Sequence, residues 1–138
     1  MYSKQEGTFI VARFDKNTSF FEDLDEVCRK YDVKGGTVVW AIGMLRDFEI
    51  GYWNGQDYDK ETFRERLEIV SLHGSIAQNE PRYHIHASGA RSNHMIVGGH
   101  LFSAVVDPLI EIQIMKVEKA EMMRVQDPSD KLFKLTIK

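Results

Sequence analysis

The sequence predicts an α+β domain, with a mostly antiparallel sheet of about seven strands and one or two packed helices. Three observations predict this fold class. One amphipathic segment carries a helix-capping signal. Most of the remaining chain divides into short β-rich runs, and at least two of these runs are joined by a tight hairpin turn. The 138 residues suit one domain, which we expect to span 1–138.

The helix is predicted over 19–33. Ser19 and Glu22 have the spacing of a capping box, in which the serine side chain accepts a hydrogen bond from the Glu22 amide. The glycines at 35–36 supply a stop, because glycine tolerates the left-handed conformation that ends many helices. Cys28 is the single cysteine, so the fold does not depend on a disulfide, and it fits the core better than a nucleophilic role. The apolar face consists of Phe20, Leu24, Val27, Cys28 and Tyr31.

The strands follow from two apolar patterns. A continuous apolar run at 37–45 indicates a strand covered on both faces, whereas alternation at 47–53 and 66–73 indicates strands with one buried face. Asn54-Gly55 is a strong hairpin turn signal, so a strand should return through 56–59. The expected strands are 8–14, 37–45, 47–53, 56–59, 66–73, 82–88, 94–103, 109–118 and 131–137.

Composition argues against several partners and locations. Apolar residues make up 43% and charged residues 28%, ordinary values for a globular protein, and the net charge is -3. This balance gives no global attraction to nucleic acid or to an anionic membrane, although it does not exclude a local basic patch. The N-terminus has no signal-peptide pattern, and no stretch reaches the ~20 apolar residues of a membrane span. We therefore expect a cytoplasmic protein with no membrane partner.

Histidines in the middle of the chain are the strongest candidates for chemistry. His84 and His86 lie two residues apart in an expected strand, so both side chains point to the same face, about 7 Å apart along the strand. That spacing suits two imidazole nitrogens that converge on one ion at about 2.0–2.1 Å each. His100 lies in the next expected strand and would complete a site with one open position, the arrangement of catalytic zinc. We therefore predict a divalent metal cofactor on His84, His86 and His100.

The hairpin register decides whether His100 reaches the pair. A hairpin centred on Ser92 places His100 directly opposite His84. A hairpin centred between Arg91 and Ser92, or a bulge at 98–99, would turn His100 to the other face. The glycines at 98–99 fit a position where the backbone bends or lies close to a neighbour. The sequence alone leaves these registers open.

Other interpretations of the same residues stay open. The histidine cluster could be structural, could contact phosphate, or could be a coincidence, and imidazole ligands also suit copper, nickel or iron. His73 and His94 are weaker candidates that fit plain exposed residues equally well. Glu68, on a neighbouring expected strand, is the candidate catalytic residue, as a general base or as a fourth ligand. An ion pair with Arg64 or Arg66 would explain Glu68 just as well.

Three blocks of the chain resemble the PPC (plants and prokaryotes conserved) domain family. The family pattern G-R-F-E-I-L-S-L-S-G corresponds to ERLEIVSLHG at 65–74, H-[IL]-H-x-S corresponds to HIHAS at 84–88, and V-x-G-G-H-L corresponds to VGGHL at 97–101. The family's valine stands slightly earlier, but the order and spacing of the blocks match. In the first block, glutamate, leucine and histidine replace the usual glycine, phenylalanine and serine, and none of these departures removes an expected ligand.

The resemblance implies an α/β fold with an antiparallel sheet and a homotrimer. Prokaryotic members that keep all three histidines are similar to metal-containing proteins, with zinc as the usual assignment. Relatives are often described as DNA-binding by analogy with plant members that carry an AT-hook, an R-G-R-P segment that enters the minor groove. This chain has no such segment, so we expect only weak DNA binding. The strand at 108–119 and the segment at 132–137 are the expected trimer interface.

Two functions from different classes are consistent with the sequence. The first is a homotrimeric zinc protein of undefined activity that performs metal-assisted chemistry on a small molecule, since a bound metal lowers the pKa of water to about 7. The second is a regulatory module that binds DNA or a protein partner around a structural metal. An open coordination position facing solvent favours the first, and a closed position or a continuous basic stripe favours the second. The sequence names no substrate, and whether the protein is an enzyme stays open.

Overall fold

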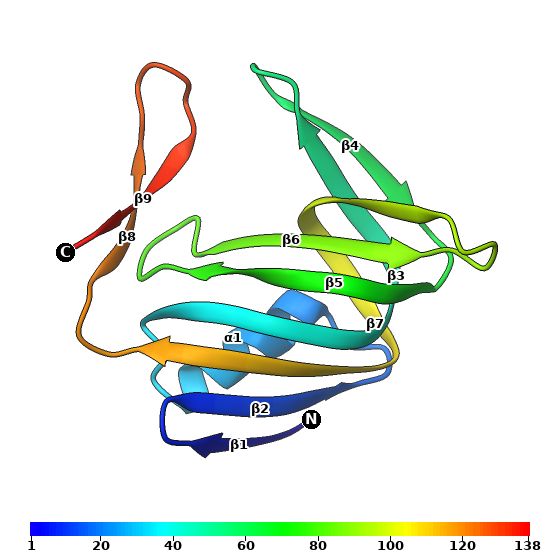
Figure 1. Cartoon of the computed structure of the whole chain (residues 1–138), viewed down its shortest axis with the longest axis horizontal. Helices are drawn as coiled ribbons and strands as arrows, with labels where there is room; N and C mark the ends of the chain where they lie inside the picture. Colours follow the sequence, from blue (N-terminus) through cyan, green and yellow to red (C-terminus); the bar gives the residue numbers. More distant parts are fainter.

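The computed structural model describes residues 1–138. Seven antiparallel strands form a sheet in the order β1-β2-β7-β6-β5-β3-β4, and the β8-β9 hairpin stands beside it (Figure 1). The single helix, α1, lies behind the large sheet in this view. These elements confirm the expected fold class. Their bounds are β1 Tyr2–Glu6, β2 Phe9–Asp15, α1 Phe20–Lys30, β3 Gly35–Trp53, β4 Tyr58–Phe63, β5 Leu67–Ile76, β6 Tyr83–Ala90, β7 Ile96–Val117, β8 Met122–Gln126 and β9 Phe133–Ile137.

The helix forms because its start and its apolar face are both encoded locally. The Ser19 side chain accepts a hydrogen bond from the Glu22 amide, 3.4 Å away, as the capping box predicts. The helix ends at Lys30 because Asp32 already takes a positive φ of 49°, a left-handed conformation that aspartate tolerates. Cys28 is buried in the helix face, as expected. No helix of the structure has the length and apolar character needed to cross a membrane.

Two strands are much longer than the sequence patterns indicate. Each joins two expected strands: β3 contains 37–45 with 47–53, and β7 contains most of 94–103 with 109–118. Register shifts interrupt the β3–β7 pairing between Val38 and Trp40 and between Arg46 and Glu49. A bulge reverses the alternation of side chains, so one continuous strand gives two separate patterns in the sequence.

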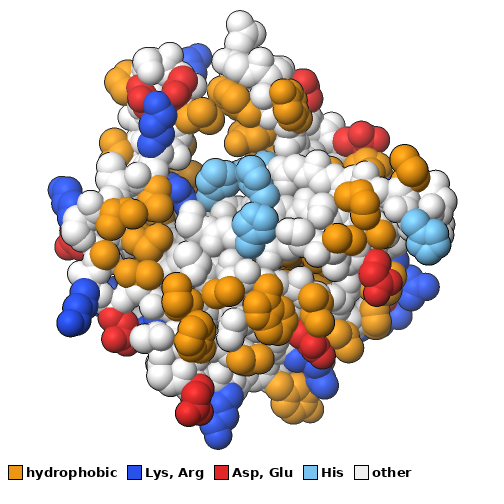
Figure 2. Space-filling model, viewed as in Figure 1, with side chains coloured by type: hydrophobic (Ala, Val, Ile, Leu, Met, Phe, Trp, Pro, Cys, Tyr) orange, Lys and Arg blue, Asp and Glu red, His pale blue; other side chains and the backbone are white.

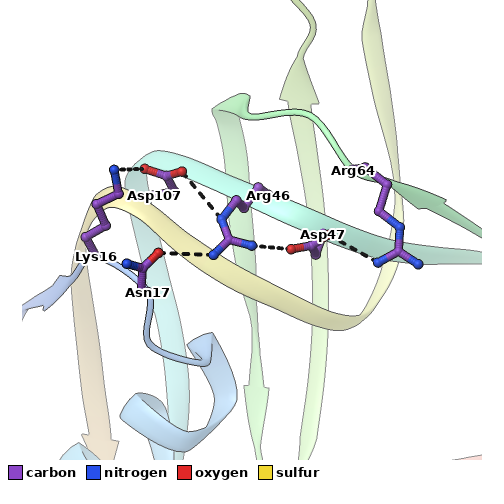
Figure 3. A network of polar contacts seen from close by, with 6 residues as sticks. All are labelled: Lys16, Asn17, Arg46, Asp47, Arg64 and Asp107. Atoms are coloured by element: carbon purple, nitrogen blue, oxygen red, sulfur yellow. Dashed lines mark hydrogen bonds and ion pairs between the residues drawn. The ribbon is translucent and has the colours of Figure 1, made fainter.

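A polar network holds the region where β3 and β7 shift register. Asp107 of β7 pairs with Lys16 and with Arg46, at 3.4 Å in both cases (Figure 3). Arg46 also pairs with Asp47 of β3, and Asp47 in turn pairs with Arg64 at 3.1 Å. Asp47 takes a positive φ of 48°. The network therefore ties the segment before α1 to the middle of both long strands.

Three shorter strands differ from expectation. β1 and β8 were not predicted, because both are only five residues long and carry polar side chains among the apolar ones. The strand that follows Asn54-Gly55 begins at Tyr58 rather than at 56. The Asn54 side chain accepts hydrogen bonds from the Gln56 and Asp57 amides, at 2.9 and 3.0 Å. The turn is therefore longer than the expected two-residue hairpin.

The two faces of the large sheet have different environments. One face packs on α1 and belongs to a core of 25 buried residues, which includes Phe14, Phe20 and Phe48. The opposite face has no covering layer within the chain, and hydrophobic side chains gather on it in Figure 2. Trp40 and Ile42 on this side are 38% and 50% exposed. The expectation that 37–45 is covered on both faces is therefore wrong for the single chain.

Candidate metal centre

Three histidines meet where β6 pairs with β7. His84 and His86 project from β6, and His100 projects from β7. The Nε2 atoms of His84 and His86 lie 3.1 Å apart, and one ring nitrogen from each of the three residues lies within 4.8 Å of the others. Figure 2 shows the cluster exposed at the foot of the opening between the β3–β4 and β8–β9 hairpins. The structure therefore brings together the three histidines that the sequence analysis selects.

The register between β6 and β7 differs from the expected one. His100 lies directly opposite His86 rather than His84. The hairpin is centred on Asn93, whose side chain accepts a hydrogen bond from the amide two residues later at 3.0 Å, whereas Ser92 was the expected centre. Moving the centre by one residue moves the partner by two, so every side chain keeps its face. His100 still reaches the pair, and only the residue opposite it changes.

A glycine pair lets β7 lie close to two neighbouring strands just before His100. A Cβ on Gly98 would lie 2.9 Å from the Ala87 carbonyl oxygen of β6, and a Cβ on Gly99 would lie 2.7 Å from the Gly51 carbonyl oxygen of β3. Real Cβ atoms do not approach this closely, so larger residues would force the strands apart. The expected close approach of the backbone at this glycine pair is confirmed.

The imidazoles are held neutral at neutral pH. Burial, followed by the neighbouring His84 and His86, lowers the pKa of His100 to about 4. Burial is also the main cause that lowers the pKa of His84 and of His86. The Nδ1 atom of His100 is buried and has no hydrogen-bond partner in the chain. Neutral imidazole is the form that binds a metal, so the cluster is electrostatically prepared for one.

Aromatic side chains from β4 and β7 pack against His100. The ring centroids of Tyr58 and Phe102 lie 5.0 Å and 4.6 Å from that of His100. The Nζ atom of Lys60 lies 3.8 Å from the Phe102 ring centroid. These ring contacts restrict the rotation of the His100 side chain.

The donor geometry fits a metal ion. Bonds of about 2.0–2.1 Å in a tetrahedral site place neighbouring ligand nitrogens about 3.3 Å apart, close to the 3.1 Å between the Nε2 atoms of His84 and His86. Imidazole donors suit zinc, and also copper, nickel or iron. No fourth His, Cys, Asp or Glu joins the group. The cluster could therefore hold a metal with one coordination position left for a small ligand.

The two weaker histidine candidates lie outside the cluster. His73 of β5 is directly opposite His86, which makes a row of three histidines across β5, β6 and β7. The Nδ1 atom of His73 lies 3.2 Å from the Ser71 hydroxyl. His94 is exposed in the loop between β6 and β7, with a positive φ of 69°. His73 therefore borders the histidine cluster. His94 lies in the loop beyond the ends of β6 and β7, the two strands that carry the cluster.

Glu68 is exposed and stands apart from the histidines. It lies opposite Ala90, four positions along β6 from His86, which corresponds to about 13 Å. Of the two arginines expected as alternative partners, Arg64 pairs with Asp47, and neither arginine pairs with Glu68. A catalytic role for Glu68 stays a prediction.

A pocket of about 430 Å³ lies against the cluster and is lined in part by His73, Ser75, His84 and His86. Arg124 of β8 contacts one of these lining residues, because its Nη2 atom donates to the Ser75 hydroxyl at 2.7 Å. The sequence analysis missed both Ser75 and Arg124. No local signal marks either residue, since β8 was not expected and only the tertiary fold brings position 124 beside position 75.

The fold and the site together define an antiparallel α+β domain with an exposed three-histidine cluster. The chain belongs to the Plants and Prokaryotes Conserved (PCC) domain family, whose model matches residues 1–118. This is the family, also abbreviated PPC, that the three sequence blocks resemble. No curated protein sequence matches the chain.

Solved structures share the fold over nearly the whole chain. A candidate DNA-binding protein from Bacteroides thetaiotaomicron is 24% identical with a TM-score of 0.89, over 98% of this chain and 96% of its own. A PPC protein from Pyrococcus horikoshii is 21% identical with a TM-score of 0.82, over 92% and 90%. A metal-containing protein from Archaeoglobus fulgidus is 26% identical with a TM-score of 0.85, over 99% of both chains. These similarities confirm the expected fold.

Proposed function

We propose that this protein is a homotrimeric metalloprotein that binds zinc through His84, His86 and His100 and carries out metal-assisted chemistry on a small molecule. The observation that carries the proposal is the convergence of three imidazoles from two paired strands: the Nε2 atoms of His84 and His86 are at ligand spacing, and one nitrogen of each residue lies within 4.8 Å of the others. Their lowered pKa values keep the nitrogen lone pairs available at neutral pH.

Zinc is the metal we assign to this site. Three imidazoles and one exchangeable ligand satisfy the tetrahedral preference of zinc, whereas a structural zinc site has four protein ligands. The similar protein from Archaeoglobus fulgidus is described as metal-containing. The exposure of His84 and His86 gives an ion and a further ligand access from solvent.

The chemistry follows from the open position. A zinc ion bound there would lower the pKa of a coordinated water and supply a nucleophile near neutral pH. His84, His86 and His100 would hold the ion, and Tyr58 and Phe102 pack against the His100 ring. Glu68 is the candidate general base. Because about 13 Å of strand separates it from His86, it would act through intervening water or through a bound substrate.

Exposed apolar side chains support the trimer. Strand pairing places Val11 of β2 and Trp40 of β3 on either side of Gln113 of β7. Val11 and Trp40 are 48% and 38% exposed in the single chain. An apolar patch of this kind on a sheet face is typical of a protein interface. It is centred on β7, which contains most of the expected interface segment at 108–119.

Elemental analysis tests the metal site directly. We expect about one zinc ion per chain in protein purified without chelator, with the metal regained after chelation and dialysis against zinc at pH 7.5. The matched control is the triple variant with His84, His86 and His100 replaced by asparagine. Wild-type protein that stays metal-free after zinc dialysis would contradict the proposal.

The second candidate function is a regulatory module that binds DNA or a protein around a structural metal. Its support is the description of the similar protein from Bacteroides thetaiotaomicron as a candidate DNA-binding protein. The net charge of -3 argues against DNA as the main partner. Fluorescence anisotropy with random duplexes should give weak binding that falls steeply with salt, as phosphate contacts alone produce. A footprint at one defined sequence in physiological salt would favour this second function.

A further inference from the structure

Arg124 is a buried cation that lacks an acidic partner. Arg124 is only 5% exposed, yet its guanidinium group forms no ion pair with any Asp or Glu of the chain. The guanidinium group has five N–H donors, and its one hydrogen bond runs from Nη2 to the Ser75 hydroxyl, at 2.7 Å. Burying a charge without a counter-charge is unfavourable. An arginine in this state is therefore suited to an anion supplied from outside the chain.

Two hydrogen bonds fix the backbone of Arg124 and so define where its side chain begins. The Asn79 side chain accepts a hydrogen bond from the Arg124 amide at 2.7 Å and donates to the Arg124 carbonyl oxygen at 2.9 Å. These two bonds fasten β8 to the turn that follows β5. The guanidinium group consequently has a defined position relative to β5 and β6.

That position borders the histidine cluster. Ser75, which holds the guanidinium, lies directly opposite His84 in the β5–β6 pairing. Burial is the main cause of the low pKa values of His84 and His100, and the positive charge of Arg124 contributes to both. In Figure 2 a basic side chain adjoins the histidines on the side of the β8–β9 hairpin.

The adjoining pocket has the chemistry of an anion site. Its volume of about 430 Å³ suits a small ligand. The lining includes hydroxyl groups from Thr37 and Ser75 and the exposed ring of His73, and it contains no carboxylate. A negatively charged ligand would meet hydroxyl donors here without a repelling acidic group, and the Arg124 guanidinium lies one hydrogen bond away, on the Ser75 hydroxyl.

We propose that the small molecule bound at this centre carries an oxyanion, a carboxylate or a phosphate group, which ligates the metal at its open position and is held by the Arg124 guanidinium. This inference rests on the proposed metal function and names the class of ligand for the same site. Arginine recognises both groups through two parallel hydrogen bonds. Arg124 lies outside residues 1–118, the part of the chain that the family model matches.

Cobalt-loaded protein provides the test, because the visible absorption of Co²⁺ changes when its ligands change. The probes are inorganic phosphate, malonate and the neutral analogue malonamide, titrated at constant ionic strength. We expect phosphate or malonate to alter the spectrum and malonamide to have no effect. Whichever of the two anions binds more tightly shows whether the ligand carries a phosphate or a carboxylate group.

Variants assign the effect to Arg124. Arg124→Gln should weaken anion binding about 10–100-fold, as expected for the loss of charge-assisted hydrogen bonds, with cobalt stoichiometry unchanged. Ser75→Ala, which removes only the hydroxyl that holds the guanidinium, should weaken binding by a smaller factor. Arg66→Gln is the matched control on the exposed surface and should bind anions like the wild type. If Arg124→Gln does not fold, Arg124→Lys and Ser75→Ala carry the comparison.

Equal anion affinities in the wild type and the folded variants would overturn the inference and leave Arg124 as a support for β8. Failure of the wild type to bind cobalt would contradict the proposed function instead. In that case phosphate binding to the metal-free chain, measured by calorimetry, decides the matter. If the metal-free wild type binds phosphate and the variants do not, the anion site is still supported. If the metal-free wild type does not bind phosphate, the inference is overturned.

Discussion

His86 and His100 face each other directly across β6 and β7, with ring centroids 5.7 Å apart. His84 adds the third ring from two positions along β6, 4.9 Å from His86 and 5.2 Å from His100. A sheet is a rigid frame for such a group, because ladder hydrogen bonds on both sides of each strand fix where the side chains begin. The backbone around the three histidines would therefore need little rearrangement when an ion binds.

Replacing His86 should weaken metal binding far more than replacing His94. We expect His86→Ala to lower zinc affinity by about 100-fold or more, since loss of a residue that only hydrogen-bonds to a ligand already lowers it about 10–100-fold. His94→Ala should leave the affinity within about twofold, because His94 lies in the exposed loop. Competition with a chromophoric chelator measures both. Equal losses in the two variants would contradict the assignment of His86, rather than His94, as a metal ligand.

The metal-free protein should lose stability as the pH falls from about 6.5 to about 4. The unfolded chain binds protons on its histidines with a pKa near 6.5, whereas the folded pKa of His100 is about 4. In this window the unfolded state binds more protons, so acid favours unfolding. Urea titrations across the window measure the effect.

The control for this pH dependence is His100→Asn, which should make the stability profile between pH 4 and 6.5 less steep, while the lowered pKa values of His84 and His86 still contribute. Asparagine does not titrate, so the His100 contribution disappears while a polar side chain stays in place. A wild-type profile that is flat across the window would contradict the lowered pKa of His100.

Trimer assembly should depend on Trp40. Trp40→Glu places a charge in the exposed apolar patch on β3 and removes an aromatic side chain whose burial contributes about 1.5–3 kcal/mol per subunit. Light scattering at micromolar concentration should show a trimer for the wild type and a monomer for the variant. Tyr52→Glu, at a 75% exposed aromatic residue near the end of the same strand, is the control and should stay trimeric. A wild-type monomer would refute the proposed assembly.

Glu68 tests whether the centre has an acid–base group. We expect Glu68→Gln to retain zinc and to abolish hydrolysis of an activated ester, because glutamine cannot accept a proton. Looser zinc binding, by about 10–100-fold, would instead make Glu68 a positioning residue. Glu65→Gln is the control, since Glu65 pairs with Arg91 at 2.7 Å. If metal and turnover are both unchanged in Glu68→Gln, Glu68 has no catalytic role.

The sequence by itself determined the features that depend on neighbours a few positions apart. The capping box at Ser19 set the start of α1, and the two-residue spacing of His84 and His86 set their common face. The glycine pair at 98–99 marked the place where backbones lie close. These features depend on local backbone geometry, namely the helical repeat, the alternation of side chains along a strand and the conformational freedom of glycine, so they can be read without knowledge of the fold.

The tertiary structure alone decided the features that depend on how distant segments meet. The centre of the β6–β7 hairpin at Asn93 determined that His100 opposes His86, because several loop lengths satisfy the same strand pattern. Bulges reverse the alternation of side chains within β3 and within β7, so each of these continuous strands gives two separate patterns in the sequence. The packing of β8 placed Arg124 beside Ser75, 49 positions away in the chain. Such contacts arise from long-range pairing, whose register is set by the packed core and not by any single segment.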